Sequence, residues 1–215
     1  MTPPARFPAG QITGLVLAGG QGQRMGGGDK GLMPFAGQSL AQRALMRLAP
    51  QVGRMMISAN RHLDTYRAFG VPVWPDASAT GRDSGALSRY DGPLAGLLAG
   101  LAHCETPWLL AVPCDAPRFP HDLAQRLSAA LDPDTEIALA ANARGEVQPV
   151  FILLRAALHE NLARYLDEGG RKVRAWAMRQ RHAITLFDHP GDDPLAFANL
   201  NMPEDWQRLA PETAV

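Results

Sequence analysis

The sequence predicts an α/β fold of three layers, in which helices cover both faces of a mostly parallel sheet. Short apolar runs of strand length alternate along the chain with segments that carry a helical stripe of leucine and alanine. Within each run the apolar residues are nearly continuous, which is typical of strands buried on both faces. No internal repeat or linker divides the 215 residues, a length that suits one domain. We therefore predict a single domain over residues 12–215, preceded by a loose tail over residues 1–11.

Local signals justify the elements in chain order. The first strand, at 12–18, is an apolar run that ends in glycines. Ser39 is a suitable N-cap for a first helix that stops at Pro50, and Pro93 suits the first turn of a later helix. The other strands are expected at residues 55–59, 71–74, 108–112, 137–141, 150–154 and 183–187. The other helices are expected at residues 62–69, 120–131, 156–166 and 172–179, and from Pro203 onward.

Composition excludes several classes of protein. The chain has 21 basic and 21 acidic residues and a formal net charge of 0, whereas a protein that binds nucleic acid through bulk charge is normally basic. No apolar run approaches the ~18 residues of a membrane span, and the first residues carry no apolar signal segment. Two cysteines cannot form a disulfide framework. These features predict a cytoplasmic protein with no nucleic-acid or membrane partner.

A glycine-rich loop at 19–37 follows the first strand. Glycines let backbone N–H groups approach an anion without a Cβ in the way, and Arg24 and Lys30 add the positive charge that a polyphosphate requires. Ligands of parallel sheets bind beyond the carboxyl ends of the strands, which is where this loop begins. The loop is not a Walker A motif, because Gly31 follows Lys30 where Ser or Thr is required. A dinucleotide fingerprint matches only formally, since the second strand ends at Asn60 without an acidic residue for a ribose.

The loop resembles the signature of the molybdenum cofactor guanylyltransferases, within the wider nucleotidyltransferase superfamily. The resemblance rests on Leu17-Ala18-Gly19-Gly20-x-Gly22-x-Arg24-Met25 and on the following Gly27-x-Asp29-Lys30-Gly31-Leu32. It continues in order along nearly the whole chain, through Ser58-Ala59-Asn60-Arg61, Asp76, Asp91-Gly92-Pro93-Leu94-Ala95-Gly96, Pro113-Cys114-Asp115-Ala116-Pro117, Gln148-Pro149-Val150 and Asn199-Leu200-Asn201-Met202-Pro203. The resemblance implies a Rossmann-like fold.

The resemblance also implies a reaction. Such enzymes transfer GMP from GTP to the terminal phosphate of molybdopterin that carries molybdenum, with release of pyrophosphate. Arg24, Lys30 and Asp115 are then the catalytic residues, and Asp115, directly after the fourth strand, is the ligand of Mg²⁺. The implied GTP contacts are Leu17, Ala18, Gly19, Gly20, Gly22, Lys30, Asn60, Asp76, Gly92 and Asp115. The implied molybdopterin contacts are Arg171, Lys172 and Asn201, and the implied protein partners deliver molybdopterin or act as chaperones of molybdoenzymes.

Two other functions fit part of the pattern. A transferase that uses CTP or a sugar phosphate would keep the glycine-rich loop and Asp115, but the run Asp29-Lys30-Gly31-Leu32 favours the guanylyl branch. A nucleotide-binding module without catalysis would tolerate loss of the metal ligand, whereas Arg24, Lys30 and Asp115 are all present. The loop at 77–91 is longer than the family usually carries before its Gly-Pro-Leu-Ala-Gly segment.

Overall fold

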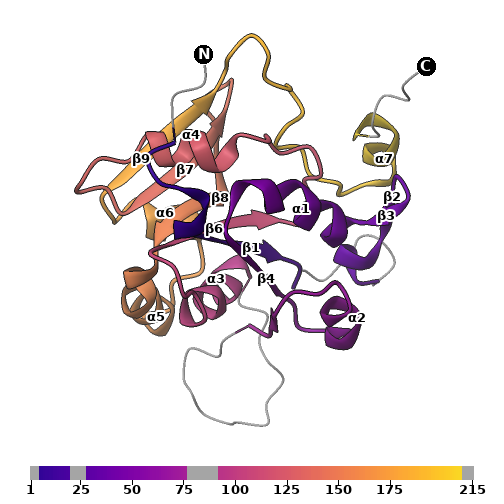
Figure 1. Cartoon of the computed structure of the whole chain (residues 1–215), viewed down its shortest axis with the longest axis horizontal. Helices are drawn as coiled ribbons and strands as arrows, with labels where there is room; N and C mark the ends of the chain where they lie inside the picture. The colour runs from indigo at the N-terminus through magenta and orange to yellow at the C-terminus, as the bar shows by residue number, and fades with distance from the viewer. Residues whose placement is uncertain (1–4, 20–27, 77–91, 210–215) are drawn as a thin grey trace.

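A seven-stranded sheet forms the middle layer of the molecule (Figure 1). The computed structural model describes residues 5–19, 28–76 and 92–209. The order of the strands across the sheet is β5-β4-β1-β6-β8-β7-β9. Their bounds are β1 (Ile12–Leu17), β4 (Arg54–Ser58), β5 (Val73–Trp74), β6 (Trp108–Pro113), β7 (Ile137–Asn142), β8 (Val147–Arg155) and β9 (His182–Phe187).

Within this sheet, β8 runs antiparallel to both of its neighbours, while the other pairs are parallel. The prediction of a mostly parallel sheet is therefore confirmed. The reversal of β8 has a consequence for the site. The amino end of β8 lies at the same edge of the sheet as the carboxyl ends of β1, β4 and β6, where ligands of such folds bind.

Helices cover both faces of the sheet, as predicted (Figure 1). On one face, α1 and α4 pack with Val16 and Leu110, and on the other, α3, α5 and α6 pack with Leu15 and Leu109. Successive residues of a strand point to opposite faces, so each central strand contributes to both clusters. The helices are α1 (Leu40–Leu48), α2 (Leu63–Arg67), α3 (Pro93–Ala102), α4 (Leu123–Ala129), α5 (His159–Asp167), α6 (Val173–Ala177) and α7 (Pro203–Leu209).

The predicted ends of several helices have the expected local chemistry. Ser39 caps α1 in a capping box with Gln42, in which each side chain bonds the backbone N–H of the other residue. Pro93 occupies the first turn of α3, where its missing N–H removes no helical bond. Gly70, with φ +81°, ends the segment that contains α2.

The predicted loop at 19–37 holds more structure than expected. In its described part, a 3₁₀ turn over Lys30–Leu32 leads into a short hairpin of β2 (Pro34–Phe35) and β3 (Gln38–Ser39). Strands of two residues leave no periodic signal, which is why the sequence did not predict them. The hairpin lies beside α7 in Figure 1, and the indole N–H of Trp206 donates to the carbonyl of Pro34 at 3.1 Å. The C-terminal helix is thereby joined to the glycine-rich segment.

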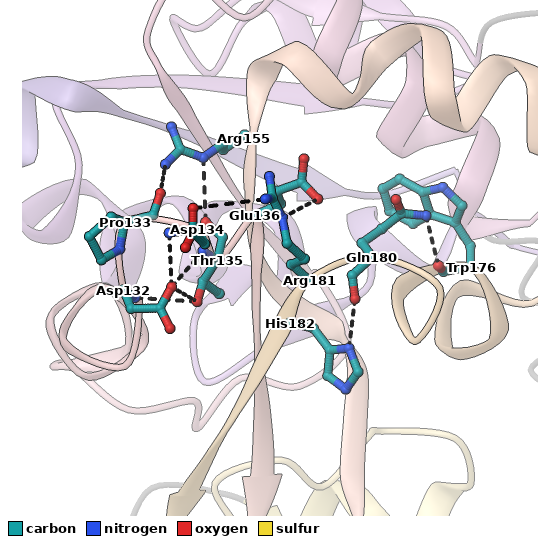
Figure 2. A network of polar contacts seen from close by, with 10 residues as sticks. All are labelled: Asp132, Pro133, Asp134, Thr135, Glu136, Arg155, Trp176, Gln180, Arg181 and His182. Carbon is teal, nitrogen blue, oxygen red and sulfur yellow. Dashed lines mark hydrogen bonds and ion pairs between the residues drawn. The ribbon is translucent and has the colours of Figure 1, made fainter.

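The opposite edge of the sheet, where β7 and β9 begin and β8 ends, is held by a polar network (Figure 2). Asp132 Oδ1 accepts hydrogen bonds from the backbone N–H and the hydroxyl of Thr135 at 2.7 and 2.6 Å, and these bonds lower the pKa of Asp132. Arg155 donates to the carbonyl of Pro133, and Arg181 pairs with Glu136 at 3.5 Å. Because each of these groups bonds its own neighbours, the network stabilises the strand ends.

The described part of the N-terminal segment lies against the domain. The ring of Phe7 stacks on Trp108 with 5.0 Å between centroids, and the backbone N–H of Arg6 donates to Ser128 Oγ at 3.3 Å. Among the residues that the structure describes, no helix combines the length and the apolar character needed to cross a membrane.

Candidate active site

A cavity of about 810 Å³ opens at the edge of the sheet where β1, β4 and β6 end. This volume lies within the range of sites for small molecules and cofactors. Six residues predicted to bind GTP line the cavity: Leu17, Gly19, Lys30, Asp76, Gly92 and Asp115. Gly92 has φ +71°, a left-handed backbone that favours glycine, directly before α3.

Lys30 and Asp115 form an ion pair in this cavity. Lys30 Nζ donates to Asp115 Oδ2 at 2.6 Å and to Asn201 Oδ1 at 2.7 Å. Only 13% of the Lys30 side chain and 19% of the Asp115 side chain are exposed. The backbone N–H of Leu200 also donates to the carbonyl of Asp115 at 2.8 Å. The ammonium group of Lys30, from the turn after β1, thus contacts Asp115 at the end of β6 and Asn201 in the segment before α7.

A second polar group surrounds Asp76, on the other side of the end of β1. Its carboxylate accepts hydrogen bonds from Ser58 Oγ and from Asn60 Nδ2, both at 2.7 Å. Its backbone N–H donates to Asn60 Oδ1 at 2.8 Å. The first two bonds hold the carboxylate oxygens, and the third holds the backbone of Asp76. Asn60 is not part of the described lining of the cavity, whereas Asp76 is. Asn60 therefore affects the cavity by holding Asp76.

Two glycines give this second group its space. A Cβ on Gly19 would lie 3.0 Å from Asn60 Nδ2, and a Cβ on Gly96 would lie 2.6 Å from Leu17 Cδ2 and 3.0 Å from Ser58 Oγ. Side chains at these positions would displace the groups that hold Asp76. Gly19 and Gly96 are therefore required for packing, because a larger side chain at either position would collide with its neighbours.

The donor set suits a divalent cation that is shared with a substrate. In the described ranges, no three His, Cys, Asp or Glu side chains gather to hold a metal by themselves. Mg²⁺ in nucleotide sites commonly takes one or two carboxylates and completes its shell with phosphate and water. Both carboxylates, Asp76 and Asp115, line the cavity. Ser58 and Asn60 engage both oxygens of Asp76, whereas Lys30 engages Oδ2 of Asp115. The residues present therefore fit such a metal at Asp115.

Cys114 precedes Asp115, is buried, and lines the same cavity. Burial raises the pKa of the Cys114 thiol, and the neighbouring charge of Asp115 raises it further. The thiol therefore stays protonated at neutral pH and is no nucleophile. The chemistry of the site depends on positioning and charge instead.

Other predicted residues lie elsewhere. Arg171 and Lys172 join α5 to α6 and are not part of the described lining of the cavity. The Arg171 guanidinium donates to the carbonyls of Leu166 and Gly170, at 3.0 and 2.7 Å. Ala18 is buried, and its N–H donates to the carbonyl of Ser58. Gly20, Gly22, Arg24 and the long loop at 77–91 lie outside the described residues.

The cavity also contains residues that the sequence did not single out as ligands. Ser58 and Gly96 shape the surroundings of Asp76, and Gln148 and Asn199 line the wall. The position of Ser58 at the end of a predicted strand was a usable signal, because such ends meet at the ligand-binding edge. Gln148 is part of the resemblance, but its place beside the other lining residues depends on the reversed direction of β8.

Comparison with known proteins agrees with this site. The model of the MobA-like NTP transferase domain matches residues 14–184. A molybdenum cofactor guanylyltransferase from Acidovorax sp. strain JS42 is 54% identical over 200 residues, which cover 88% of this chain and 90% of that protein. A protein of the same name from Ralstonia nicotianae is 48% identical over 213 residues, covering 95% and 98% of the two chains.

Solved structures share the fold. Molybdopterin-guanine dinucleotide biosynthesis protein A from Archaeoglobus fulgidus superposes with a TM-score of 0.68 at 18% identity, covering 91% of this chain and 95% of that one. A 4-diphosphocytidyl-2C-methyl-D-erythritol synthase from Anaerococcus prevotii gives a TM-score of 0.67 at 10% identity, covering 93% and 94%. Similarity at such identity shows a common fold only. By its domain match and its close relatives, the chain belongs to the molybdenum cofactor guanylyltransferases, a family of nucleotidyltransferase enzymes.

Proposed function

We propose that the chain transfers GMP from GTP to the terminal phosphate of molybdenum-loaded molybdopterin. The observation that carries the proposal is the ion pair of Lys30 and Asp115 in a cavity of nucleotide size, in a chain 54% identical to a protein named for this activity. In the reaction, an oxygen of the acceptor phosphate forms a bond to the α-phosphorus of GTP. The bond from that phosphorus to the bridging oxygen of the β-phosphate breaks, and pyrophosphate leaves with the electron pair.

Lys30 is proposed to bind the phosphates of GTP. Its ammonium group has three donors that rotate freely, so it can exchange Asp115 for a phosphate oxygen while Asn201 still holds it. A cation fixed in a partly enclosed site stabilises the charge that develops on leaving pyrophosphate. Arg24 of the signature loop is proposed to contribute in the same way, and Gly20 and Gly22 are proposed to contribute backbone N–H groups.

Asp115 is proposed to hold Mg²⁺. When bound, the ion would neutralise phosphate charge and polarise the α-phosphate for attack. The backbone N–H of Leu200 donates to the backbone carbonyl of Asp115, and this bond holds Asp115 at the carboxyl end of β6. Because the attacking group is itself a phosphate, the protein needs no covalent nucleophile, which agrees with the protonated thiol of Cys114.

Asp76 is proposed to read the guanine base. Guanine presents N1–H and N2–H₂ donors beside the O6 acceptor, and a fixed carboxylate accepts from such donors. Asn60 and Ser58 support this proposal because they hold both oxygens of Asp76. Leu17, Ala18, Gly19 and Gly92 are proposed as the remaining contacts of GTP.

The acceptor is proposed to reach the cavity from the C-terminal half of the chain. Asn201 is within hydrogen-bond distance of Lys30, and this contact supports an acceptor site next to the GTP site. Arg171 and Lys172 are exposed cations that suit a phosphate group. Proteins that deliver molybdopterin or receive the product are proposed partners. The free thiols of Cys104 and Cys114 suit the reducing cytoplasm, where we propose that the enzyme acts.

The proposal is tested with the four nucleoside triphosphates, Mg²⁺ and an acceptor loaded with molybdenum and molybdopterin. Release of pyrophosphate and the mass of the product are measured for each nucleotide. GTP alone is expected to give a dinucleotide. A cytidine dinucleotide would favour a cytidylyltransferase, and binding of GTP without pyrophosphate release would favour a nucleotide-binding module.

A further inference from the structure

The segment Asp29-Lys30-Gly31-Leu32 is the most specific part of the signature, but the proposed reaction uses only Lys30. Asp29 is the N-cap of the 3₁₀ turn over Lys30–Leu32, and its Oδ1 accepts the backbone N–H of Gly31 at 3.2 Å. Such a cap fixes the backbone of a short turn. Asp29 thereby sets the direction in which Lys30 leaves the backbone.

The same oxygen of Asp29 has a second partner. The hydroxyl of Tyr66, from α2, donates to Asp29 Oδ1 at 2.5 Å. Tyr66 is completely buried, and burial raises the pKa of its hydroxyl, so the group stays protonated and acts as a donor. A buried donor on a helix is a rigid anchor for the carboxylate.

Gly31 provides the space for this contact. A Cβ at position 31 would lie 2.3 Å from Tyr66 Oη and 3.2 Å from Ala18 Cβ. A side chain at this position would therefore push the hydroxyl away from Asp29. Asp29, Gly31 and Tyr66 form one packed unit directly beneath the turn that carries Lys30.

We propose that Tyr66 and Asp29 are positioning residues for Lys30, which hold its ammonium group at Asp115 and Asn201 ready for the phosphates of a nucleoside triphosphate. This inference rests on the proposed function of Lys30. The contacts run from Tyr66 Oη to Asp29, through the capped turn to Lys30 Nζ, and from there to Asp115 at 2.6 Å and Asn201 at 2.7 Å. Neither positioning residue lines the described cavity, so each acts through Lys30.

The chain offers a direct readout of Lys30 because it contains only two lysines, Lys30 and Lys172. Lys172 is exposed, whereas the Lys30 side chain is 13% exposed and bonded to two partners. Brief acetylation with acetic anhydride, followed by mass spectrometry, gives the ratio of modified Lys30 to modified Lys172. The ratio reports the placement of Lys30 without any nucleotide.

The variants are Tyr66→Phe, Asp29→Ala and Asp29→Asn. Phenylalanine keeps the ring that packs against Phe69 and removes only the hydroxyl. Asparagine keeps an oxygen that accepts from both Tyr66 and Gly31, so it is the conservative rescue of Asp29→Ala. Thr13→Val is the matched control, since it also removes a buried hydroxyl, bonded to Thr106 at 2.7 Å, but at the other end of β1.

In Tyr66→Phe and Asp29→Ala we expect the labelling ratio to rise several-fold and kcat for pyrophosphate release from GTP to fall about 10-fold. Asp29→Asn and Thr13→Val are expected to leave both quantities close to wild type. Tyr66→Phe in a Lys30→Met background is expected to add no further loss of kcat.

An unchanged labelling ratio in folded Tyr66→Phe and Asp29→Ala would overturn the positioning role. An equal loss of kcat in Thr13→Val would do the same, because it would trace the effect to general stability. If circular dichroism shows that Tyr66→Phe does not fold, the comparison of Asp29→Ala with Asp29→Asn tests the positioning role without it. Failure of the wild-type protein to release pyrophosphate from GTP would reject the proposed function, while the labelling ratio would still report on the positioning of Lys30.

Discussion

At the scale of single residues, Lys30 and Asp115 form the ion pair on which the proposed mechanism depends. Both side chains are mostly buried, and they lie 2.6 Å apart at the carboxyl edge of the sheet. Removing one partner of a partly buried ion pair costs more stability than removing one partner of an exposed pair. The two residues are thus coupled, and the replacement of either one changes the other.

Asp115→Asn tests the carboxylate without changing its shape. Asparagine still accepts a hydrogen bond from Lys30, but it lacks the negative charge needed to hold a cation against the α-phosphate. We expect GMP transfer to fall at least about 100-fold, as on loss of a transition-state stabiliser. GTP affinity, measured by calorimetry, is expected to change much less. Turnover near the wild-type rate would show that Asp115 has no role at the metal.

Gly96→Ala tests the packing around Asp76. The new Cβ would lie 2.6 Å from Leu17 Cδ2, 3.0 Å from Ser58 Oγ and 3.3 Å from Asp76 Oδ1. Alanine improves helix propensity by about 1 kcal/mol, so a loss of function would come from the crowding. We expect KM for GTP to rise about 10-fold with a smaller change in kcat.

The control for this variant is Gly191→Ala, because a Cβ at Gly191 meets nothing within 4 Å. It is expected to keep the wild-type KM. Steady-state kinetics measure KM for GTP in the wild type and in both variants. Equal KM values in Gly96→Ala and wild type would mean that the cavity next to Asp76 does not bind GTP.

At the scale of elements, α7 and the hairpin of β2 and β3 tie the C-terminal segment to the site. Phe35 and Trp206 meet edge to face, with 6.3 Å between ring centroids, and Leu200 is buried against them. In the first turn of α7, the carboxylate of Asp205 accepts hydrogen bonds from the backbone N–H groups of the preceding Asn201 and Met202, at 2.8 and 2.9 Å. This start of α7 fixes the backbone of the residue that holds Lys30.

Asp205→Ala is expected to loosen that segment. Only 15% of the Asp205 side chain is exposed, and it bonds two backbone N–H groups as a helix cap does, so the expected loss of unfolding free energy is about 1 kcal/mol, and kcat is expected to fall a few-fold. The hydrogen bonds from Asn201 and Met202 lower the pKa of Asp205 below its ordinary value of 3.8. A lowered folded-state pKa means that the stabilisation is complete above that ordinary value and disappears as the pH falls below it.

Urea unfolding of the wild type and of Asp205→Ala at pH 7 and at pH 3 checks this behaviour. The difference in stability between the two proteins should be larger at pH 7. A difference that grows toward low pH would have the wrong sign for a carboxylate with a lowered pKa.

The same scale shows what the sequence could and could not predict. The positions of β1, β4, β6 and α1 followed from continuous apolar runs, a capping serine and a helical stripe, which are local signals. The hairpin of β2 and β3 is too short to leave such a signal. The antiparallel pairing of β7 and β8 follows from their short connection at 143–146, which cannot hold the crossover that a parallel pair needs. The pairing of β8 with β6 is not local, and the sequence pattern did not predict it.

At the scale of the whole molecule, parallel strands bring distant motifs to one edge. Lys30 and Asn201 are 171 positions apart and share a hydrogen bond. The sequence placed both in a nucleotidyltransferase site through the resemblance, but their contact with each other could not be predicted, because it depends on how α7 returns to the hairpin. Ser58, Tyr66 and Gly96 were missed for a similar reason, since they act through neighbours that only the fold supplies.

The most direct test of the proposed reaction follows the two ends of the triphosphate separately. The purified protein is incubated with Mg²⁺, molybdenum-loaded molybdopterin, and GTP that carries a radioactive phosphorus at either the α or the γ position. The mechanism predicts that the α label enters the guanine dinucleotide and that the γ label leaves in pyrophosphate, with neither transfer in Asp115→Asn. Release of the γ label as inorganic phosphate, with no α label in the acceptor, would contradict guanylyl transfer.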